Sequence, residues 1–386
     1  MVVMVLDHTR DFVHAGALRF DPTDLTQTTL ALFLTRWVTH FCAPAFVFLA
    51  GTAAYLQKAR GLPRAALSRF LLTRGLWLVL LEFTVVRGGT WFNLDYSFLG
   101  VAQVIWVLGV SMVALSALVY LPLAAIAAVG LAMVALHNGL DGVRVEEWHG
   151  PGSAVPGLAA RIWILLHQPG SLVPIAGAGG PIVWVVYPLV PWIGVMAAGY
   201  ACGGLYTREG PRRVQWLVRL GAAFTVLFVA LRLSNLYGDP HPWSAQATPF
   251  WTLLSFVNTT KYPPSLLFLL MTLGPSLLLA WLDGRGVRGG AGRALVMFGR
   301  VPLFFYLLQW PLAHAAAVGA TRLAGKDTGY LFSSPPAFPA TAPPDAGFPL
   351  GVVYVCWAAV IVVLFFVCRW FADVKRRNPS PLLRYL

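Results

Sequence analysis

Apolar residues run along this chain in long blocks, separated by shorter polar segments. The blocks approach 20 residues, the helix length needed to cross about 30 Å of hydrocarbon. The pattern predicts about ten transmembrane helices, covering 1–17, 29–56, 67–87, 97–119, 121–138, 181–205, 214–235, 263–282, 294–318 and 348–372. The expected fold class is therefore all-α: a polytopic membrane helix bundle that forms a single transmembrane domain over residues 1–386.

Composition supports a membrane protein. Hydrophobic residues make up 58% of the chain and charged residues only 11%, whereas soluble proteins carry about 25% charged residues. The net charge of +13 would suggest nucleic acid in a soluble protein. Here the basic residues gather at the ends of apolar blocks, so the lipid bilayer is the expected partner and nucleic acid is not.

The connections between blocks alternate in charge. One set is short and basic and includes Lys58, Arg60, Arg64, Arg208, Arg212, Arg213, Lys375, Arg376 and Arg377; the other set is longer and nearer neutral or acidic, at 139–180, 236–262 and 319–347. The positive-inside rule places the basic set in the cytoplasm. With ten spans, both termini are then cytoplasmic.

The first predicted span is short on its cytoplasmic side. Six residues precede Asp7, which is about 9 Å of helix at about 1.5 Å per residue. We expect that the natural start lies upstream or that the chain is a truncated product. The alternative is a short helix that packs entirely against protein.

Ionisable residues gather inside these apolar blocks, at residues 7–14 and 36–40. Each costs roughly 2.5–3.5 kcal/mol at membrane depth, so such residues usually mark a functional site. Asp7, Asp11 and His14 recur at i, i+4 and i+7 and share one helical face, and Arg36 and His40 lie one turn apart. The same outer half of the bundle is predicted to hold Asn258, Lys261, Tyr262 and His314. These positions predict a polar chamber that is open to the outside.

The inner half of the bundle carries mainly arginines near the cytoplasmic ends of spans, namely Arg74, Arg219, Arg300 and Arg369. Such residues commonly extend to lipid headgroups. The alternative is a basic cytoplasmic mouth that binds a phosphate-bearing ligand.

Seven sequence blocks carry a family resemblance. They are LDHTRDF (6–12), FDPTDL (20–25), TRWVTHFCAPAFVFLAG (35–51), YPLVPWIGVMAAGYACG (187–203), NLYGDPHPW (235–243), NTTKYPPSLLFLLMTLGP (258–275) and GRVPLFFYLLQWPLAH (299–314). The chain resembles the heparan-alpha-glucosaminide N-acetyltransferase-like family of transmembrane acyltransferases, in its bacterial branch. The resemblance implies a multi-pass protein of the bacterial inner membrane.

The resemblance also implies a reaction. The donor would be cytosolic acetyl-CoA or another acyl-CoA, and the acceptor a hydroxyl or amine of an extracytoplasmic glycan or amino sugar. His14 is the nearest positional counterpart of the family's catalytic histidine. His8 falls about where the family has a pocket asparagine, and His40 where it has an aspartate.

Acyl transfer needs a base for the acceptor proton, and histidine suits this role because its pKa is near neutrality. His8, flanked by Asp7 and Asp11, supplies such a pair, and His14 and His40 compete with it. Substrate binding is expected from Arg10, Arg36, Asn258, Lys261, Tyr262 and His314, and binding of the CoA phosphates from Arg74 and Arg300.

Each group also has a structural interpretation. Arg10 with the two aspartates could be an ion-pair network that locks helices together. His40 could be a hydrogen-bonded packing residue, and Lys261 with Tyr262 could belong to an ordinary helix start. His149 and His167 are expected to be ordinary loop residues, and no metal site is expected, since the cysteines lack ligand spacing.

Two other function classes stay open besides the acyltransferase. A secondary transporter of a small polar substrate is the main alternative, although no inverted repeat is visible. A structural membrane protein with polar helix locks is the third. A homodimer is compatible with the sequence.

Overall fold

The computed structural model describes residues 1–17, 19–170, 172–177, 180–282, 289–335, 341–378, 380 and 383. The chain is mostly helical and separates into two compact units. Unit 1 comprises Met1–Cys42, Thr84–Phe98 and Gly286–Leu386, and unit 2 comprises Ala43–Phe83 and Leu99–Arg285.

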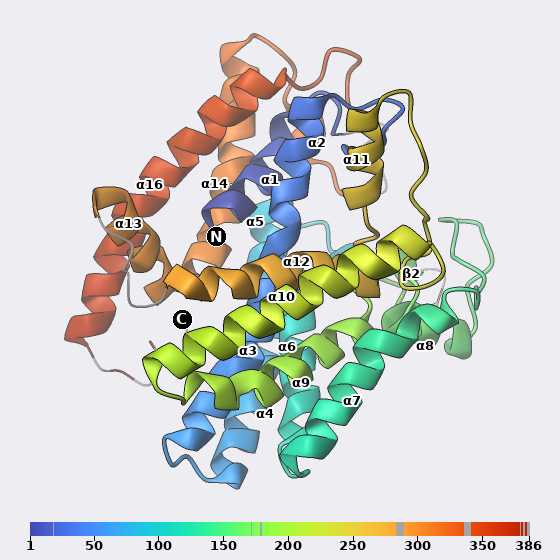
Figure 1. Ribbon diagram of the computed structural model, residues 1–386. Coiled ribbons are helices and arrows are strands. Elements are labelled where there is room, and N and C mark those ends of the chain that lie inside the picture. The colour runs from blue at the N-terminus through green and yellow to red at the C-terminus, as the bar shows by residue number, and fades with distance from the viewer. Residues whose placement is uncertain are drawn as a thin grey trace. The chain divides into compact units, whose positions relative to one another are not determined.

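Unit 1 is built around the first helix. Its elements are α1 (Val2–Val13), α2 (Leu30–Trp37), η1 (Val38–Phe41), α5 (Arg87–Trp91), α13 (Gly289–Arg300), α14 (Pro302–Leu323), η5 (Gly329–Phe332) and α16 (Leu350–Arg377). Helix α1 packs against both α14 and α16 (Figure 1). Leu6, Val13, Ala317 and Val353 are buried together in this contact and form the local core.

Unit 2 holds the remaining helices and a small sheet. Its elements are α3 (Cys42–Ala59), α4 (Arg64–Leu81), the π-helical segment η2 (Glu82–Val86), β1 (Phe98–Ala102), α6 (Val104–Leu118), α7 (Leu123–Leu136), η3 (His137–Leu140), α8 (Leu158–Leu166), β2 (Leu172–Pro174), β3 (Ile182–Val185), α9 (Leu189–Tyr206), α10 (Gly210–Ser234), α11 (Pro249–Val257), α12 (Leu266–Leu278) and η4 (Leu279–Leu282). The largest helix contacts join α4 with α6, α10 with α12, and α7 with α9. The division between units falls within α3, η2 and β1.

Glycines let the helices of unit 2 approach at backbone distance. A Cβ added at Gly51 of α3 would lie 2.0 Å from the carbonyl oxygen of Met196 on α9, and one at Gly199 would lie 2.1 Å from that of Phe48. Small residues at helix interfaces are typical of membrane bundles, where close van der Waals packing drives association.

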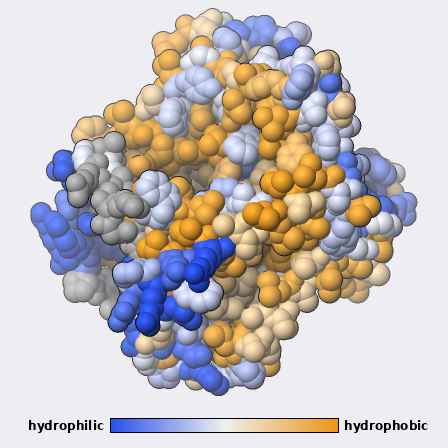
Figure 2. All heavy atoms as spheres, viewed as in Figure 1, coloured by the Kyte–Doolittle hydropathy of each residue, from blue (hydrophilic) through white to orange (hydrophobic). Residues whose placement is uncertain are grey.

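Among the described residues, six helical stretches are long and apolar enough to cross a membrane. They are Leu30–Ala59, Leu123–Leu140, Leu189–Tyr206, Gly210–Ser234, Pro302–Leu323 and Leu350–Arg377, and the shorter apolar helices are Val104–Leu118 and Leu266–Leu282. Apolar side chains cover much of the face drawn in Figure 2. Examples of highly exposed apolar residues are Val226 on α10 (67%) and Val355 on α16 (69%). An apolar exterior of this kind indicates an integral membrane protein; ten spans and cytoplasmic termini stay predictions.

Several predicted helix boundaries are wrong. Residues 98–102 and 182–185 are strands β1 and β3, in a three-stranded sheet of order β1-β3-β2. β2 and β3 pair antiparallel, with Val173 opposite Val183. A short apolar run cannot be assigned to strand or helix by hydropathy alone.

Proline and local turns account for the other differences. The span predicted at 294–318 is two helices, α13 and α14, separated at Val301, whose φ and ψ are −132° and 53°. The following Pro302 disfavours a helical conformation at Val301. Helix α1 ends at Val13, and His14 adopts an extended backbone conformation, so the part of the predicted first span that follows Val13 is not helical in the described residues.

Candidate active site

A buried ion-pair network links α1 to α2 within unit 1. The Asp7 side chain is buried, and its Oδ1 accepts a hydrogen bond of 2.9 Å from Arg10 Nη2 while its Oδ2 accepts one from Arg36. Arg10 Nη2 also donates to Asp11 Oδ1 at 2.6 Å. We refer to Asp7, Arg10, Asp11 and Arg36 as the α1 charge cluster. Helical periodicity placed Asp7 and Asp11 on one face together with His14, and the structure joins the two aspartates through Arg10.

Burial limits how much this cluster adds to stability. Arg10 is 3% exposed, and removing such charges from water offsets much of the attraction between them, so buried ion pairs often add little net stability. Asp11 is different, because its side chain is 47% exposed. The cluster therefore extends from a buried carboxylate to one that reaches the surface of unit 1.

His8 lies beside the cluster on the same helix. Its ring packs against Trp310 of α14, with ring centroids 3.8 Å apart, and its Nδ1 lies 3.9 Å from Asp11 Oδ2. Asp11 Oδ2 and His8 Nδ1 are therefore neighbours without a direct hydrogen bond between these two atoms.

His14 follows α1 directly and is half-buried. Its Nδ1 accepts a 3.0 Å hydrogen bond from the Gly16 amide, so the neutral ring carries its proton on Nε2. The backbone on either side is fixed by hydrogen bonds of 2.8 Å from Phe348 N to Val13 O and 3.0 Å from Ala15 N to Phe348 O. The ring therefore has a defined tautomer and a fixed position at the end of α1.

The other two predicted histidines of unit 1 are buried. His40 lies in η1, which packs against α1, and is 3% exposed. His314 is fully buried, and its ring stacks with Phe92 at 4.1 Å and Phe12 at 4.9 Å between centroids. Their roles in catalysis and in substrate binding stay predictions.

The predicted residues Asn258, Lys261 and Tyr262 belong to unit 2. Lys261 Nζ lies 5.2 Å from the centroid of the Tyr262 ring, and that ring contacts Tyr187 edge to face. The Asn258 carbonyl accepts a 2.8 Å hydrogen bond from Arg232 Nη2. Lys261 and Tyr262 are thus in contact with each other, whereas a chamber shared with the α1 charge cluster stays a prediction.

Arg232 organises this part of unit 2, a role that hydropathy did not indicate. The side chain is 1% exposed. It donates to backbone carbonyls of Phe256, His241, Ser255 and Asn258 at 2.9, 2.8, 3.2 and 2.8 Å. We call this set the Arg232 network. It fixes the loop that precedes Lys261.

A basic cavity of about 340 Å³ lies in unit 1 between α13 and α16. Its charged lining residues are Arg300, Arg369, Lys375 and Arg376, with Asp373 as the acidic member. Four bases against one acid leave an excess of positive charge, which suits a phosphate-bearing ligand. The structure thus places Arg300 beside Arg369, while Arg74 is half-buried in α4 of unit 2.

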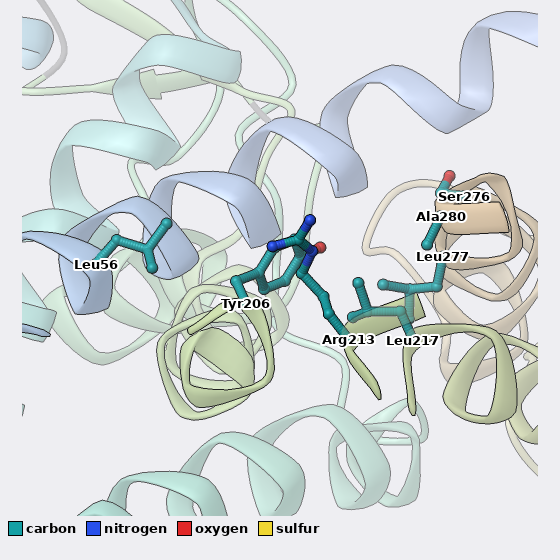
Figure 3. A pocket seen from close by; sticks show the side chains of 7 residues that line it. All are labelled: Leu56, Tyr206, Arg213, Leu217, Ser276, Leu277 and Ala280. Carbon is teal, nitrogen blue, oxygen red and sulfur yellow. The ribbon is translucent and has the colours of Figure 1, made fainter. Parts of the chain in front are cut away.

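A second cavity, of about 370 Å³, lies in unit 2 and is shown in Figure 3. Arg213 and Tyr206 lie close together there, and the remaining lining is Leu56, Leu217, Ser276, Leu277 and Ala280. Arg213 is the single charged residue of this lining, so the cavity suits a polyphosphate less well than the basic cavity of unit 1.

A third polar cluster was missed by the sequence analysis. His137, Asp141 and His167 bring their ligand-type atoms within 4.8 Å of one another. They lie beside a cavity of about 310 Å³ that Asp141 and His167 help to line. The spacing of four residues between His137 and Asp141 was an available signal. Nothing in the sequence indicated that His167 would join them.

The pKa of Asp141 is lowered from its usual value. Burial acts to raise it, but hydrogen bonds from His167 and Asn138, together with the charges of the two histidines, outweigh burial. Asp141 is therefore a carboxylate near neutral pH, which is the form that hydrogen-bond donors and cations bind.

The protein is of the class of polytopic membrane proteins with a polar site. This follows from its helical spans, its apolar exterior and its buried ion-pair network. The family model for heparan-alpha-glucosaminide N-acetyltransferase, catalytic, matches residues 2–235. The chain therefore belongs to this family of membrane acetyltransferases. The matched region contains the α1 charge cluster, His14 and His40. A comparison with curated proteins found no match.

Proposed function

We propose that this protein transfers an acetyl or similar small acyl group from cytosolic acyl-CoA to a hydroxyl or amine of an extracytoplasmic glycan or amino sugar. The bacterial plasma membrane is the proposed location. The observation that carries the proposal is the α1 charge cluster, a buried carboxylate held by two guanidinium groups next to two histidines. It lies within the region matched by the family.

The two histidines suit different steps. His8, with Asp11 nearby, takes the proton from the acceptor as it attacks the thioester carbonyl. His14 carries its proton on Nε2 and donates it to the departing CoA thiolate, so that the acylated acceptor and CoA thiol are the products. Each proton removed is matched by one delivered, and solvent exchange resets both rings. An acyl-histidine intermediate is the alternative route.

The charge cluster positions these histidines. Arg10 and Arg36 together fix Asp7, and Arg10 also orients Asp11, the carboxylate nearest His8. The guanidinium groups add positive charge where the thioester oxygen becomes negative during transfer. The cluster is thus a positioning and electrostatic element, while proton exchange falls to the histidines.

The basic cavity of unit 1 is the proposed binding site for the CoA phosphates. Arg300 and Arg369 lie on its wall with two further bases, and arginine binds phosphate oxygens in a bidentate manner. Arg74, in unit 2, stays a second candidate for contact with the cofactor.

The test uses the full chain in detergent or liposomes with labelled acetyl-CoA and a panel of amino sugars and glycans. Release of CoA thiol and label in the acceptor are both measured. We expect transfer by the wild type and losses of about 10²–10⁴-fold in kcat for His8→Ala and His14→Ala, the usual contribution of general acid–base catalysis. The control is His149→Ala, an exposed loop histidine of unit 2.

Retained transfer in both histidine variants would contradict the assignment of the site. Absence of CoA release and of labelled product with every acceptor would contradict the function. For the cofactor, Arg300→Ala should raise the KM for acetyl-CoA, whereas Arg377→Ala, which removes an exposed base of α16 outside the cavity lining, should not. Equal effects of these two variants would overturn the cofactor site.

A further inference from the structure

The cluster of His137, Asp141 and His167 lies wholly within unit 2 and is not used by the proposed acyl transfer. His137 begins η3 directly after α7, Asp141 follows η3, and His167 caps α8. The three side chains thus connect the ends of two helices with the loop between them. His167 Nε2 lies 3.1 Å from Asp141 Oδ1, and the two imidazole centroids are 5.6 Å apart.

We infer that these three residues bind a divalent transition-metal ion of the zinc type. Two imidazoles and one carboxylate are a ligand set that zinc accepts, with metal–ligand distances of about 2.0–2.2 Å. Tetrahedral ligands at those distances lie about 3.3–3.5 Å apart. Asp141 Oδ1 and His167 Nε2 lie 3.1 Å apart, slightly closer than this separation, and the ligand atoms of all three residues lie within 4.8 Å of one another, so small side-chain shifts bring the set to tetrahedral distances.

The hydrogen bonding of His137 supports this inference. Its side chain is 2% exposed, yet neither ring nitrogen makes a hydrogen bond of ordinary geometry, although the Pro264 carbonyl lies close to the ring. Leaving a buried polar atom unsatisfied is unfavourable. A metal-bound histidine usually directs its other ring nitrogen to a carbonyl or carboxylate, and the Pro264 carbonyl supplies that partner.

Asn138 positions the Asp141 carboxylate through a hydrogen bond to the oxygen that does not face His167. The Asn138 amide donates a 2.8 Å hydrogen bond to Asp141 Oδ2, and its Oδ1 accepts a 2.8 Å hydrogen bond from Leu266 N at the start of α12. This leaves Asp141 Oδ1 directed at His167. Such outer partners orient metal ligands and are part of a functional metal site.

The adjoining cavity leaves room for a further ligand. It measures about 310 Å³, and Asp141 and His167 lie on its wall together with Thr260, Tyr262 and Arg144. Three protein ligands with an open fourth position are typical of zinc sites that bind water or an anion. Arg144 also lies on this wall, and its positive charge would repel a bound metal ion. Because the side chain is exposed, solvent screens that charge.

The test measures zinc bound to the full chain, purified in detergent without a polyhistidine tag, stripped with a chelator and then titrated with zinc alone. We expect about one zinc ion per chain for the wild type. His137→Ala and His167→Ala should each weaken binding by at least about 100-fold, more than the roughly 10–100-fold typical of an outer partner. Asn138→Ala should show the smaller effect, and His149→Ala should bind as the wild type does.

Cobalt(II) provides a second measurement on unmodified protein. Visible absorption bands of tetrahedral cobalt that zinc displaces are expected for the wild type and for His149→Ala, and not for Asp141→Asn. If the alanine variants fail to fold, the cobalt spectra of the wild type and of Asp141→Asn test the metal site instead. Failure of the wild type to bind either metal, or equal binding by Asp141→Asn, would overturn the site. Because zinc binding is measured without acyl transfer, its outcome is independent of the proposed reaction.

Discussion

The α1 charge cluster of unit 1 and the Arg232 network of unit 2 bury arginine side chains in contrasting ways. In unit 1, Arg10 and Arg36 converge on one carboxylate, Asp7, from two different helices. In unit 2, Arg232 donates its hydrogen bonds to four backbone carbonyls and lies 3.9 Å from the nearest Asp239 oxygen. In the first arrangement, the charges of side chains neutralise one another. In the second, one side chain satisfies the backbone carbonyl groups of a loop.

The contrast concerns the partners and not the unit. Arg87, in unit 1, is 2% exposed and donates to backbone carbonyls of Asn93, Asp95 and Phe98, much as Arg232 does in unit 2. A carbonyl cannot change its charge, whereas a carboxylate can exchange protons and can respond to a substrate. We therefore expect a buried arginine bound to carbonyls to be structural, and we propose a chemical role for one bound to a carboxylate beside histidines.

The largest expected effect concerns stability and tests Arg232, whose hydrogen bonds go to backbone carbonyls. Arg232→Ala leaves four carbonyls without their donor, and we expect a destabilisation of about 4 kcal/mol or more, the range of severe core defects. Arg232→Lys should restore little of the lost stability, because an ammonium group lacks the planar set of donors that a guanidinium group offers. Thermal unfolding of the detergent-solubilised protein measures this, with Arg219→Ala, an exposed arginine of the same helix, as control. A stable Arg232→Ala variant would break the comparison.

The next effect concerns the close backbone contact between α3 and α9 in unit 2. Gly51→Ala places a methyl group 2.0 Å from the Met196 carbonyl oxygen, so α3 and α9 must separate, at a cost of about 3 kcal/mol by overpacking. Gly319→Ala in α14 of unit 1 meets nothing within 4 Å and should be neutral or stabilise by about 0.5–1 kcal/mol. Equal melting temperatures for the two variants would show that the close approach does not hold the helices.

Asp7→Asn separates chemistry from stability in the α1 charge cluster. Asparagine still accepts a hydrogen bond and Arg10 keeps Asp11, so we expect a loss of only about 1–3 kcal/mol in stability. Acyl transfer should fall by about 100-fold, as expected when positioning is lost. Combining Asp7→Asn with Arg36→Gln should restore part of the stability and none of the activity. Normal turnover in the single variant would assign the cluster a purely structural role.

The smallest effect provides the matched control in unit 1. The Tyr354 hydroxyl lies 2.7 Å from Thr35 Oγ1 and joins α16 to α2 next to Arg36. Tyr354→Phe removes that hydrogen bond, and we expect a loss of about 1 kcal/mol in stability with unchanged kcat. A marked loss of kcat in this variant would mean that any loosening of α2 impairs transfer, and the effect of Asp7→Asn would lose its specificity.

Part of the candidate site could be predicted from the sequence, and part could not. The grouping of Asp7, Arg10 and Asp11 follows from helical periodicity, because residues three and four apart share a face, and polar residues in apolar blocks are conspicuous. Arg36 was identified by the same signal, although its contact with Asp7 joins two helices. Which of His8, His14 and His40 exchanges protons was left open, because the environment of each ring depends on residues such as Trp310 and Gly16.

The sequence by itself determined that this chain is a mostly helical membrane protein of the heparan-alpha-glucosaminide N-acetyltransferase family, because hydropathy, charge placement and local motifs are written along the chain. Only the tertiary structure decided where apolar runs become strands, how Arg232 closes its loop, and that His137, Asp141 and His167 meet. The physical reason is distance along the chain: periodicity relates residues within a few turns, whereas side chains 26 or more residues apart, such as Asp141 and His167, are brought together only by the packing of whole helices.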